Sequence, residues 1–366
     1  MENNHINVLD LSFTQLKELV SSLGAPAYRA GQILTWVYRK LASSYDEMSD
    51  LPQTLRQKLT EKTVLFTLKP LEEMGSKDGL TRKVLFQLED GKTLEATLMS
   101  YDETGDSRER RTVCVSTQVG CPIGCLFCAT GQQGFERNLT PGEIIEQILY
   151  FAREVDQEAA AEKSSISRRP ITNVVFMGMG EPLANYENVW QAITMLNSKE
   201  GLELGARQMT LSTSGLVPQI LRLSQEKLHI ELAVSLHAAN NSLRNKLMPI
   251  NQKYPLEQLI PACKQYFAVS GRRITFEYAL FQGVNDSLDQ ARELADLLKG
   301  MNCSVNLIAG NPTACEEFKS STRIQAIAFQ KQLTALNIVS TIRVSRGTDI
   351  EAGCGQLKSR WLNTKK

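Results

Sequence analysis

Three cysteines lie close together at positions 121, 125 and 128, in the run Cys-Pro-Ile-Gly-Cys-Leu-Phe-Cys. Thiolates are the usual ligands of iron–sulfur clusters, and a [4Fe-4S] cluster normally takes four of them. Three close thiolates would leave one iron open to an exchangeable ligand. Zinc sites take four ligands, usually as two close pairs, and no second pair lies nearby in the sequence. Three unrelated core cysteines are the other alternative. The spacing favours a cluster held by Cys121, Cys125 and Cys128.

A glycine-rich run with a carboxylate follows a predicted strand at 173–177. It reads Phe-Met-Gly-Met-Gly-Glu-Pro-Leu and contains Gly178, Gly180 and Glu181. Glycines let a ligand approach the backbone closely, and a carboxylate accepts hydrogen bonds from an ammonium group. Alone, this run would indicate an ordinary turn. After a three-cysteine motif it predicts a ligand-binding loop, with Gly180 and Glu181 as the contacts.

Polar groups also follow three other predicted strands, at 212–215 (Ser-Thr-Ser-Gly), 235–237 (Ser-Leu-His) and 311–312 (Asn-Pro). They could bind ribose or carboxylate oxygens, although each alone could equally be a helix cap or a turn. Two further cysteines stand out. Cys114 lies on a predicted strand just before the three-cysteine motif, and Cys354 lies between two glycines that leave its sulfur unobstructed.

Strands and helices are predicted to alternate from about residue 112 onward. The predicted strands are 113–116, 173–177, 208–212, 230–236, 273–280, 304–308 and 340–344, with helices at 141–153, 189–197 and 287–299. Such alternation implies parallel strands joined by right-handed crossovers. Both an open doubly wound sheet and a barrel fit, and these strands, of which six are counted as the main ones, are too few for an eight-stranded barrel. In both folds, ligands gather at the carboxyl ends of the strands.

Four regions are predicted along the chain. Residues 1–66 read as a helical domain, because apolar residues recur at helical spacing. Residues 67–106 read as a β-hairpin extension, with an Asp-Gly turn between strands at 81–88 and 93–99. The α/β domain is expected at 107–350 and a C-terminal segment with Cys354 at 351–366. An Ala-, Glu-, Lys- and Ser-rich stretch at 154–169 indicates a solvated loop or a helix extension.

The chain has 366 residues, of which 42% are hydrophobic and 22% charged, enough to bury a large core. No apolar run is long enough to span a membrane, and the N-terminus has no signal-peptide pattern. We therefore expect a cytoplasmic protein with reduced thiols and no membrane partner. The net charge of +1 does not indicate nucleic acid binding, so such binding would rest on basic clusters at 108–111, 272–273 and 358–366.

Together, these motifs closely resemble the RlmN/Cfr family of radical S-adenosylmethionine (SAM) enzymes, which are RNA adenine methyltransferases. The matching segments are 114–121, 128–131, 137–140, 178–183, 247–251, 283–286 and 354–357, with 28–33, 36–38 and 46–48 before them. The resemblance implies an α/β fold with a partial (β/α)6 radical SAM barrel and a [4Fe-4S] cluster on the three cysteines. It implies SAM contacts at Gly180, Glu181, Ser212, Ser235, Leu236, His237 and Asn311.

The resemblance also implies a mechanism that uses two SAM molecules per turnover. The first methylates the Cys354 thiolate, and the second yields a 5′-deoxyadenosyl radical that takes a hydrogen from the S-methyl group. The resulting radical adds to the base and joins enzyme and RNA covalently. Cys114 then attacks the Cys354 sulfur, a transient disulfide forms, and the methylated base is released. Glu95 matches the family's proposed acceptor of the ring proton.

The implied substrates are adenine C2 in 23S rRNA, at the peptidyl transferase centre, and an adenine beside the anticodon of tRNA. An external donor such as flavodoxin or ferredoxin would supply electrons, and a monomer is expected. A C8-methylating enzyme of the same family has the same cysteines, and Arg273–Tyr278 favours the RlmN branch. An iron–sulfur electron carrier is a distant alternative, because it would have no use for Glu181 or Cys354.

Overall fold

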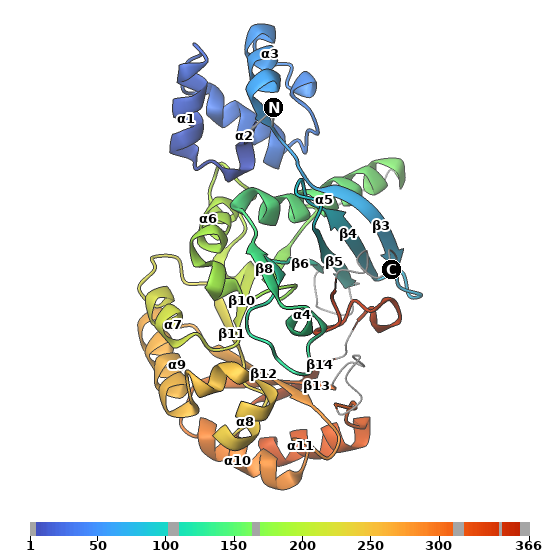
Figure 1. Cartoon of the computed structure of the whole chain (residues 1–366), viewed down its shortest axis with the longest axis vertical. Coiled ribbons are helices and arrows are strands. Elements are labelled where there is room, and N and C mark those ends of the chain that lie inside the picture. The colour runs from blue at the N-terminus through green and yellow to red at the C-terminus, as the bar shows by residue number, and fades with distance from the viewer. Residues whose placement is uncertain (1–4, 102–109, 163–168, 310–317, 344–345, 359–366) are drawn as a thin grey trace.

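The computed structural model describes residues 5–101, 110–162, 169–309, 318–343 and 346–358. The first of these segments begins with a helical module at one end of the molecule, drawn in blue in Figure 1. Its helices are α1 (Phe13–Ser22), α2 (Arg29–Tyr38) and α3 (Gln53–Lys62), and the short strands β1 (Ile6–Asn7) and β2 (Thr63–Val64) pair beside them. Ser12 and Gln15 form a capping box that starts α1. The helical pattern predicted for this region is present.

Ten strands form one sheet within the described residues, in the spatial order β14-β13-β12-β11-β10-β9-β6-β5-β4-β3. Their bounds are β3 (Lys69–Gly75), β4 (Thr81–Gln87), β5 (Thr93–Tyr101), β6 (Arg110–Cys114), β9 (Asn173–Phe176), β10 (Met209–Thr213), β11 (Glu231–Ser235), β12 (Ile274–Leu280), β13 (Cys303–Ala309) and β14 (Ser340–Arg343). The seven strands from β6 to β14 pair in parallel, as predicted. Each predicted strand lies in its place, with ends that differ by three residues or fewer.

The hairpin β4–β5 is continuous with this sheet, because β5 pairs antiparallel with β6 and aligns Thr97 with Cys114. The sequence predicted the hairpin and its Asp-Gly turn but not this connection. It also did not predict β3, which is an edge strand with a register shift between Pro70 and Glu72. Charged and proline residues are common on such edges, and they hide the alternation that marks a strand.

Helices flank the parallel strands in Figure 1. They are α5 (Pro141–Glu162), α6 (Tyr186–Asn197), α7 (Val217–Leu223), α8 (Asn241–Leu247), α9 (Leu256–Ser270), α10 (Leu288–Leu298) and α11 (Arg323–Ala335). Helix α5 covers the hairpin, since the ring of Tyr150 packs edge-on against Phe86 at 5.0 Å. It also continues to Glu162, so the described part of the 154–169 stretch is a helix extension.

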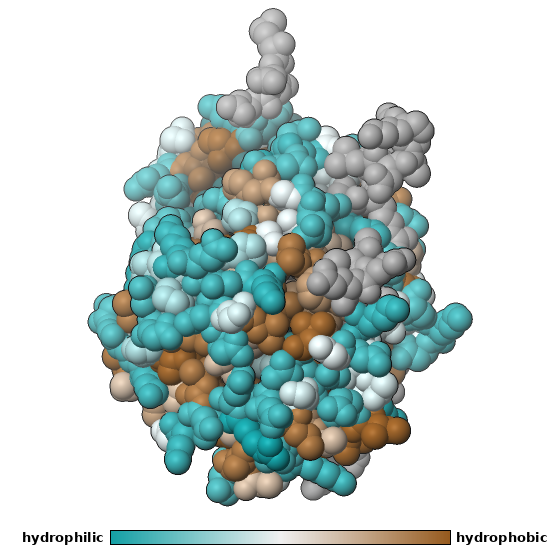
Figure 2. Space-filling model, turned by 60° about the horizontal axis from the view of Figure 1, so that its bottom comes forward, coloured by the Kyte–Doolittle hydropathy of each residue, from teal (hydrophilic) through white to brown (hydrophobic). Residues whose placement is uncertain are grey.

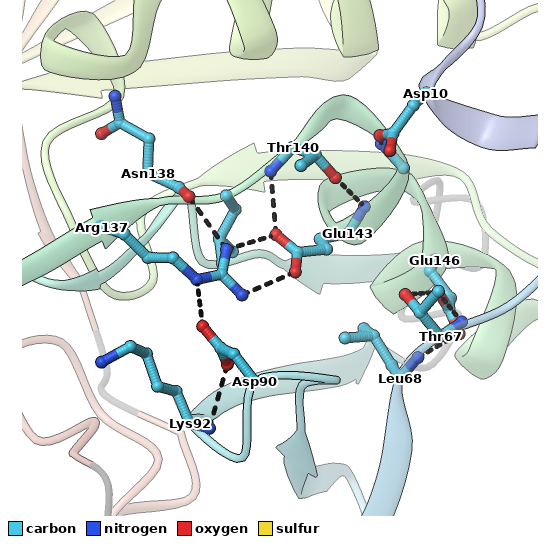
Figure 3. Close-up of polar contacts among 12 residues, drawn as sticks. Asp10, Thr67, Leu68, Asp90, Lys92, Arg137, Asn138, Thr140, Glu143 and Glu146 are labelled. Carbon is cyan, nitrogen blue, oxygen red and sulfur yellow. Dashed lines mark hydrogen bonds and ion pairs between the residues drawn. The ribbon is translucent and has the colours of Figure 1, made fainter. Parts of the chain in front are cut away.

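Ion pairs and helix-end hydrogen bonds join the hairpin to helix α5, as Figure 3 shows. Arg137 lies on β8 (Phe135–Asn138) and binds both oxygens of Glu143 at 2.8 Å. The same guanidinium binds Asp90 at the hairpin turn, at 2.6 Å. Asp10 of the helical module accepts from the Gly142 N–H at 2.7 Å, at the start of α5. The helical module, the hairpin and the α/β sheet therefore all meet at the N-terminal end of α5.

The face in Figure 2 carries hydrophobic side chains in separate groups among hydrophilic ones. Scattered exposed apolar residues are normal on a protein surface. No helix in the described ranges combines the length and the apolar character needed to cross a membrane.

The strand β7 (Gln118–Gly120) pairs with β8, and the close approach of the two backbones at Gly120 leads to a first prediction. Gly120 has φ +71°, and an added Cβ would lie 1.9 Å from the Gly134 carbonyl oxygen. We expect Gly120→Ala to lower the free energy of unfolding by about 3 kcal/mol, because clash and strain add. Gly124 is the control, with φ +69° and open space around its Cβ position. Gly124→Ala should cost only about 1 kcal/mol, measured by thermal melting, and equal losses would contradict the clash.

Candidate active site

One pocket lies at the carboxyl ends of the parallel strands, and its wall contains residues from every strand between β5 and β14 in the sheet order. Such a wall requires that the sheet curve around the pocket, as in an incomplete barrel. The pocket brings together most of the residues that the sequence predicted as functional. These are Cys114, Cys121, Cys125, Cys128, Gly180, Glu181, Ser212, Ser235, His237 and Cys354.

The three-cysteine loop leaves β7 at Gly120 and ends at the short helix α4 (Ala129–Gln132). Burial raises the pKa of Cys121 to about 12 and that of Cys125 well above its usual range, and the neighbouring sulfurs add to both shifts. Metal cations would stabilise these partly buried neighbouring thiols as thiolates. In the described ranges, no three His, Cys, Asp or Glu side chains converge on one point as a single metal ion would require. In a [4Fe-4S] cluster each thiolate binds its own iron, so this donor set fits a cluster.

Gly180 and Glu181 follow β9 and lie against the cysteine loop. Gly180 has φ +101°, and an added Cβ would lie 2.6 Å from the Gln118 side chain, so only glycine fits. The Glu181 carboxylate accepts from the backbone N–H groups of Leu183 at 3.0 Å and Ser214 at 2.7 Å. Its burial nevertheless raises its pKa. These bonds fix a buried carboxylate in the pocket, where an ammonium group would stabilise it.

His237 follows β11 by two residues and adopts a left-handed backbone with φ +57°. Its Nδ1 accepts from the Ala279 N–H at 2.9 Å, and burial lowers the pKa of the ring to about 3. The imidazole is therefore neutral and carries its proton on Nε2. The side chain of Leu236, another predicted SAM contact, packs in the core and does not line the pocket. Buried Arg244 binds the carbonyl oxygens of Ser214, Ser235 and Leu236 at 2.7–3.1 Å.

Cys114 and Cys354 both line the pocket, although they are far apart in the sequence. Cys114 is buried, and burial raises the pKa of its thiol to about 12. Cys354 is exposed, and both are free thiols. Arg343, at the end of β14, lies close enough that the Cys354 thiolate raises the pKa of its guanidinium. The positive charge of Arg343 in turn lowers the pKa of Cys114.

The structure places Glu95 differently from the pocket residues. Glu95 lies on β5 but outside the pocket wall, fully buried and paired with Lys83 at 3.1 Å. Asn311 lies outside the described residues.

The sequence analysis missed a row of polar side chains across the pocket side of the sheet. Glu277, Asn306 and Thr341 stand opposite one another on β12, β13 and β14. Thr341 donates to Asn306 at 2.7 Å, and Asn306 donates to Glu277 at 3.0 Å. The other Glu277 oxygen is buried and has no hydrogen-bond partner among the described residues. Buried parallel strands are normally apolar throughout. Polar residues at alternate positions of these strands could therefore have indicated the polar row from the sequence.

Comparisons with known proteins agree with this architecture. Residues 115–298 match the model of the Radical SAM superfamily, and residues 6–65 match the Ribosomal RNA large subunit methyltransferase N-terminal domain. The crystal structure of a radical SAM methyltransferase from Sphaerobacter thermophilus is similar, with a TM-score of 0.89 and 47% identity. It covers 96% of this chain and 99% of its own. The fold and site thus define a radical SAM methyltransferase, which uses a [4Fe-4S] cluster and SAM.

Relatives that match almost the whole chain show which family of radical SAM methyltransferases this protein belongs to. The "Probable dual-specificity RNA methyltransferase RlmN" of Moorella thermoacetica is 47% identical over 344 residues, which are 94% of each chain. The protein of the same name from Thermotoga sp. (strain RQ2) is 44% identical, covering 98% of this chain and 99% of its own. The chain belongs to the RlmN family.

The shared position of the three cysteines predicts iron loss when one is removed. Anaerobically purified protein should hold about four iron atoms per chain, and Cys125→Ala should lose nearly all of them. Cys263→Ala is the control, because Cys263 is a buried core thiol away from the pocket wall. That variant should lose stability but keep its iron. Iron and acid-labile sulfide assays measure both, and a full cluster in Cys125→Ala would overturn the ligand assignment.

Proposed function

We propose that this enzyme methylates C2 of adenine in 23S rRNA, at the peptidyl transferase centre, and in tRNA beside the anticodon. The observation that carries the proposal is the meeting of Cys114 and Cys354 in the pocket that also holds the three-cysteine loop. A methyltransferase that used SAM only as a methyl donor would need neither cysteine. The names of the full-length relatives supply the RNA substrate.

Cys121, Cys125 and Cys128 would hold the cluster, and the Glu181 carboxylate would receive the SAM ammonium group. Ser212, Ser235 and the Nε2–H of His237 offer further polar contacts to SAM, and the family resemblance adds Leu236 and Asn311 as contacts. When bound, the cluster and SAM supply a 5′-deoxyadenosyl radical. The buried walls of the pocket would exclude water from that chemistry.

Cys354 is suited to carry the methyl group, because its sulfur is exposed at the pocket and flanked by Gly353 and Gly355. Its thiolate would take a methyl group from one SAM, and the carbon on this sulfur would then join the base. Arg343 lies in the same wall of the pocket and brings a positive charge close to Cys354.

Cys114 is suited to release the product, because it faces the same pocket from β6. Its sulfur would attack the Cys354 sulfur, forming a disulfide while the sulfur–carbon bond to the base breaks. The carbon keeps that bonding pair, takes a proton and becomes the methyl group. Burial raises the pKa of the Cys114 thiol, so it must lose its proton before attack, which the nearby charge of Arg343 favours. An external dithiol would then reduce the disulfide.

Glu95 stays our candidate for the acceptor of the ring proton, although its carboxylate lies beneath the C-terminal segment. Arg343 and Arg346 in the pocket wall, with the helical module, would bind the RNA backbone. The predicted basic clusters at 108–111 and 358–366 lie mostly outside the described residues. The target base must be unstacked to enter. We expect a cytoplasmic monomer that receives electrons from an external donor such as flavodoxin or ferredoxin.

Mapping of methyladenosine isomers tests the reaction and its position. RNA from cells that lack the gene should lose 2-methyladenosine from 23S rRNA and tRNA, and restoring the gene should return it. The RNA is digested with nuclease and analysed by mass spectrometry, and comparison with synthetic isomer standards distinguishes the products. Loss of 8-methyladenosine instead would assign the enzyme to the C8 branch, and an unchanged pattern would contradict the proposal.

The geometry of the two cysteines predicts a trapped intermediate. Cys114→Ala should still allow addition to the base but not release, so RNA should stay attached to Cys354 after denaturation. Peptide mass spectrometry should locate the adduct on Cys354, and wild-type protein should carry only S-methylcysteine there. The double variant Cys114→Ala/Cys354→Ala should carry no adduct. Normal turnover by Cys114→Ala would show that Cys114 is only a packing residue.

A further inference from the structure

A buried ion pair lies beneath the segment that carries Cys354. Lys83 on β4 and Glu95 on β5 point to the same side of the hairpin, since Lys83 stands opposite Thr97 and Leu85 opposite Glu95. Their charged atoms are 3.1 Å apart, and each side chain is only 1% exposed. A buried ion pair seldom increases stability over apolar residues of similar size. Its presence here therefore calls for another role.

Each member of the pair also binds the C-terminal segment. The Lys83 ammonium donates to the carbonyl oxygen of Glu351 at 3.2 Å. The Glu95 carboxylate accepts from the backbone N–H of Lys358 at 2.8 Å. The Glu351 carboxylate and the Lys358 ammonium lie 3.5 Å apart, so the two ends of the segment meet above the pair. Cys354 lies midway between these two ends.

Leu357 packs in the hydrophobic core, and further hydrogen bonds hold the rest of this segment. It contains no helix or strand after the 3-10 turn at Thr348–Ile350. Gly355 accepts from the Ala129 N–H at 2.8 Å, and Leu357 accepts from the Thr130 hydroxyl at 2.7 Å. Those bonds attach it to α4, at the end of the cysteine loop, while the ion pair attaches it to the hairpin. Hydrogen bonds to charged groups are stronger than neutral ones.

We propose that Lys83 is a positioning residue whose pair with Glu95 anchors both ends of the 351–358 segment and thereby sets the place of Cys354 over the pocket. The importance of that placement rests on the proposed role of Cys354 as methyl carrier. Two buried charges suit such an anchor, because neither can leave its partners without a large desolvation cost. The Glu95 carboxylate could accept a proton from the base only after its hydrogen bond from the Lys358 backbone N–H is broken.

Hydrogen–deuterium exchange of the cluster-loaded enzyme without RNA tests the anchor directly. Lys83→Met should raise the exchange rate of the 351–358 peptide by about tenfold, the effect of losing a charged hydrogen bond. Lys92→Met is the control, because Lys92 also pairs with a glutamate, Glu136, but on the partly exposed hairpin turn. Exchange in that variant should match the wild type.

A double variant separates anchoring from general stability. Lys83→Met/Glu95→Leu leaves no unpaired buried charge, so its melting temperature should return near that of the wild type. Its 351–358 peptide should still exchange about tenfold faster. Wild-type protection in the double variant would overturn the proposal, as would faster exchange spread evenly over the hairpin.

The methylation state of Cys354 distinguishes this proposal from the proposed function. In one turnover with SAM, both Lys83 variants should methylate Cys354 several-fold more slowly than the wild type and Lys92→Met. Absence of methyl on wild-type Cys354 would refute the methyl-carrier role, while the exchange data would still report on the anchor.

Discussion

The pairing of β5 with β6 is the constraint on which the rest of the site depends. It fuses the hairpin with the parallel sheet and sets Thr97 beside Cys114. Because side chains alternate along a strand, this register also turns Met99 and Tyr101 to the pocket and Glu95 beneath the C-terminal segment. A shift of one residue would reverse all of these directions. The hairpin is therefore part of the pocket wall, and it also binds the segment that carries Cys354.

Desolvation governs the chemistry of the pocket. Burial raises the pKa values of Cys114, Cys121 and Cys125, and it lowers that of His237 to about 3. Such surroundings favour neutral groups, and a thiolate becomes favourable only beside a positive charge. A cluster held by the cysteine loop would supply such charge there, and Arg343 brings it near Cys114 and Cys354. The same low-polarity surroundings would protect a radical from water.

The interactions at the start of α5 connect the RNA-binding expectation with the catalytic centre. Asp10 attaches the helical module to this helix, and Arg137 joins the helix, the hairpin turn and β8, which brackets the cysteine loop (Figure 3). Buried Glu146 on the same helix accepts from the backbone of Thr67 and Leu68, where the chain passes from the module to the sheet. An RNA held by the module would therefore contact a rigid frame that also positions the cluster loop.

The sequence by itself determined the parallel α/β architecture, the hairpin, the cysteine loop and the Gly180–Glu181 turn. Those features depend on local spacing: side-chain periodicity along each strand and helix, and ligands within one loop. Only the tertiary structure decided which distant residues meet. Arg343 and Glu277 reach the pocket because strands far apart in sequence curve around it. Lys83 pairs with Glu95 across the hairpin, and the segment around Cys354 binds both residues. These contacts join distant parts of the chain, so the sequence around each residue carries no pattern that predicts them. Charge burial is likewise a property of the folded chain, because it depends on all the neighbours that exclude water.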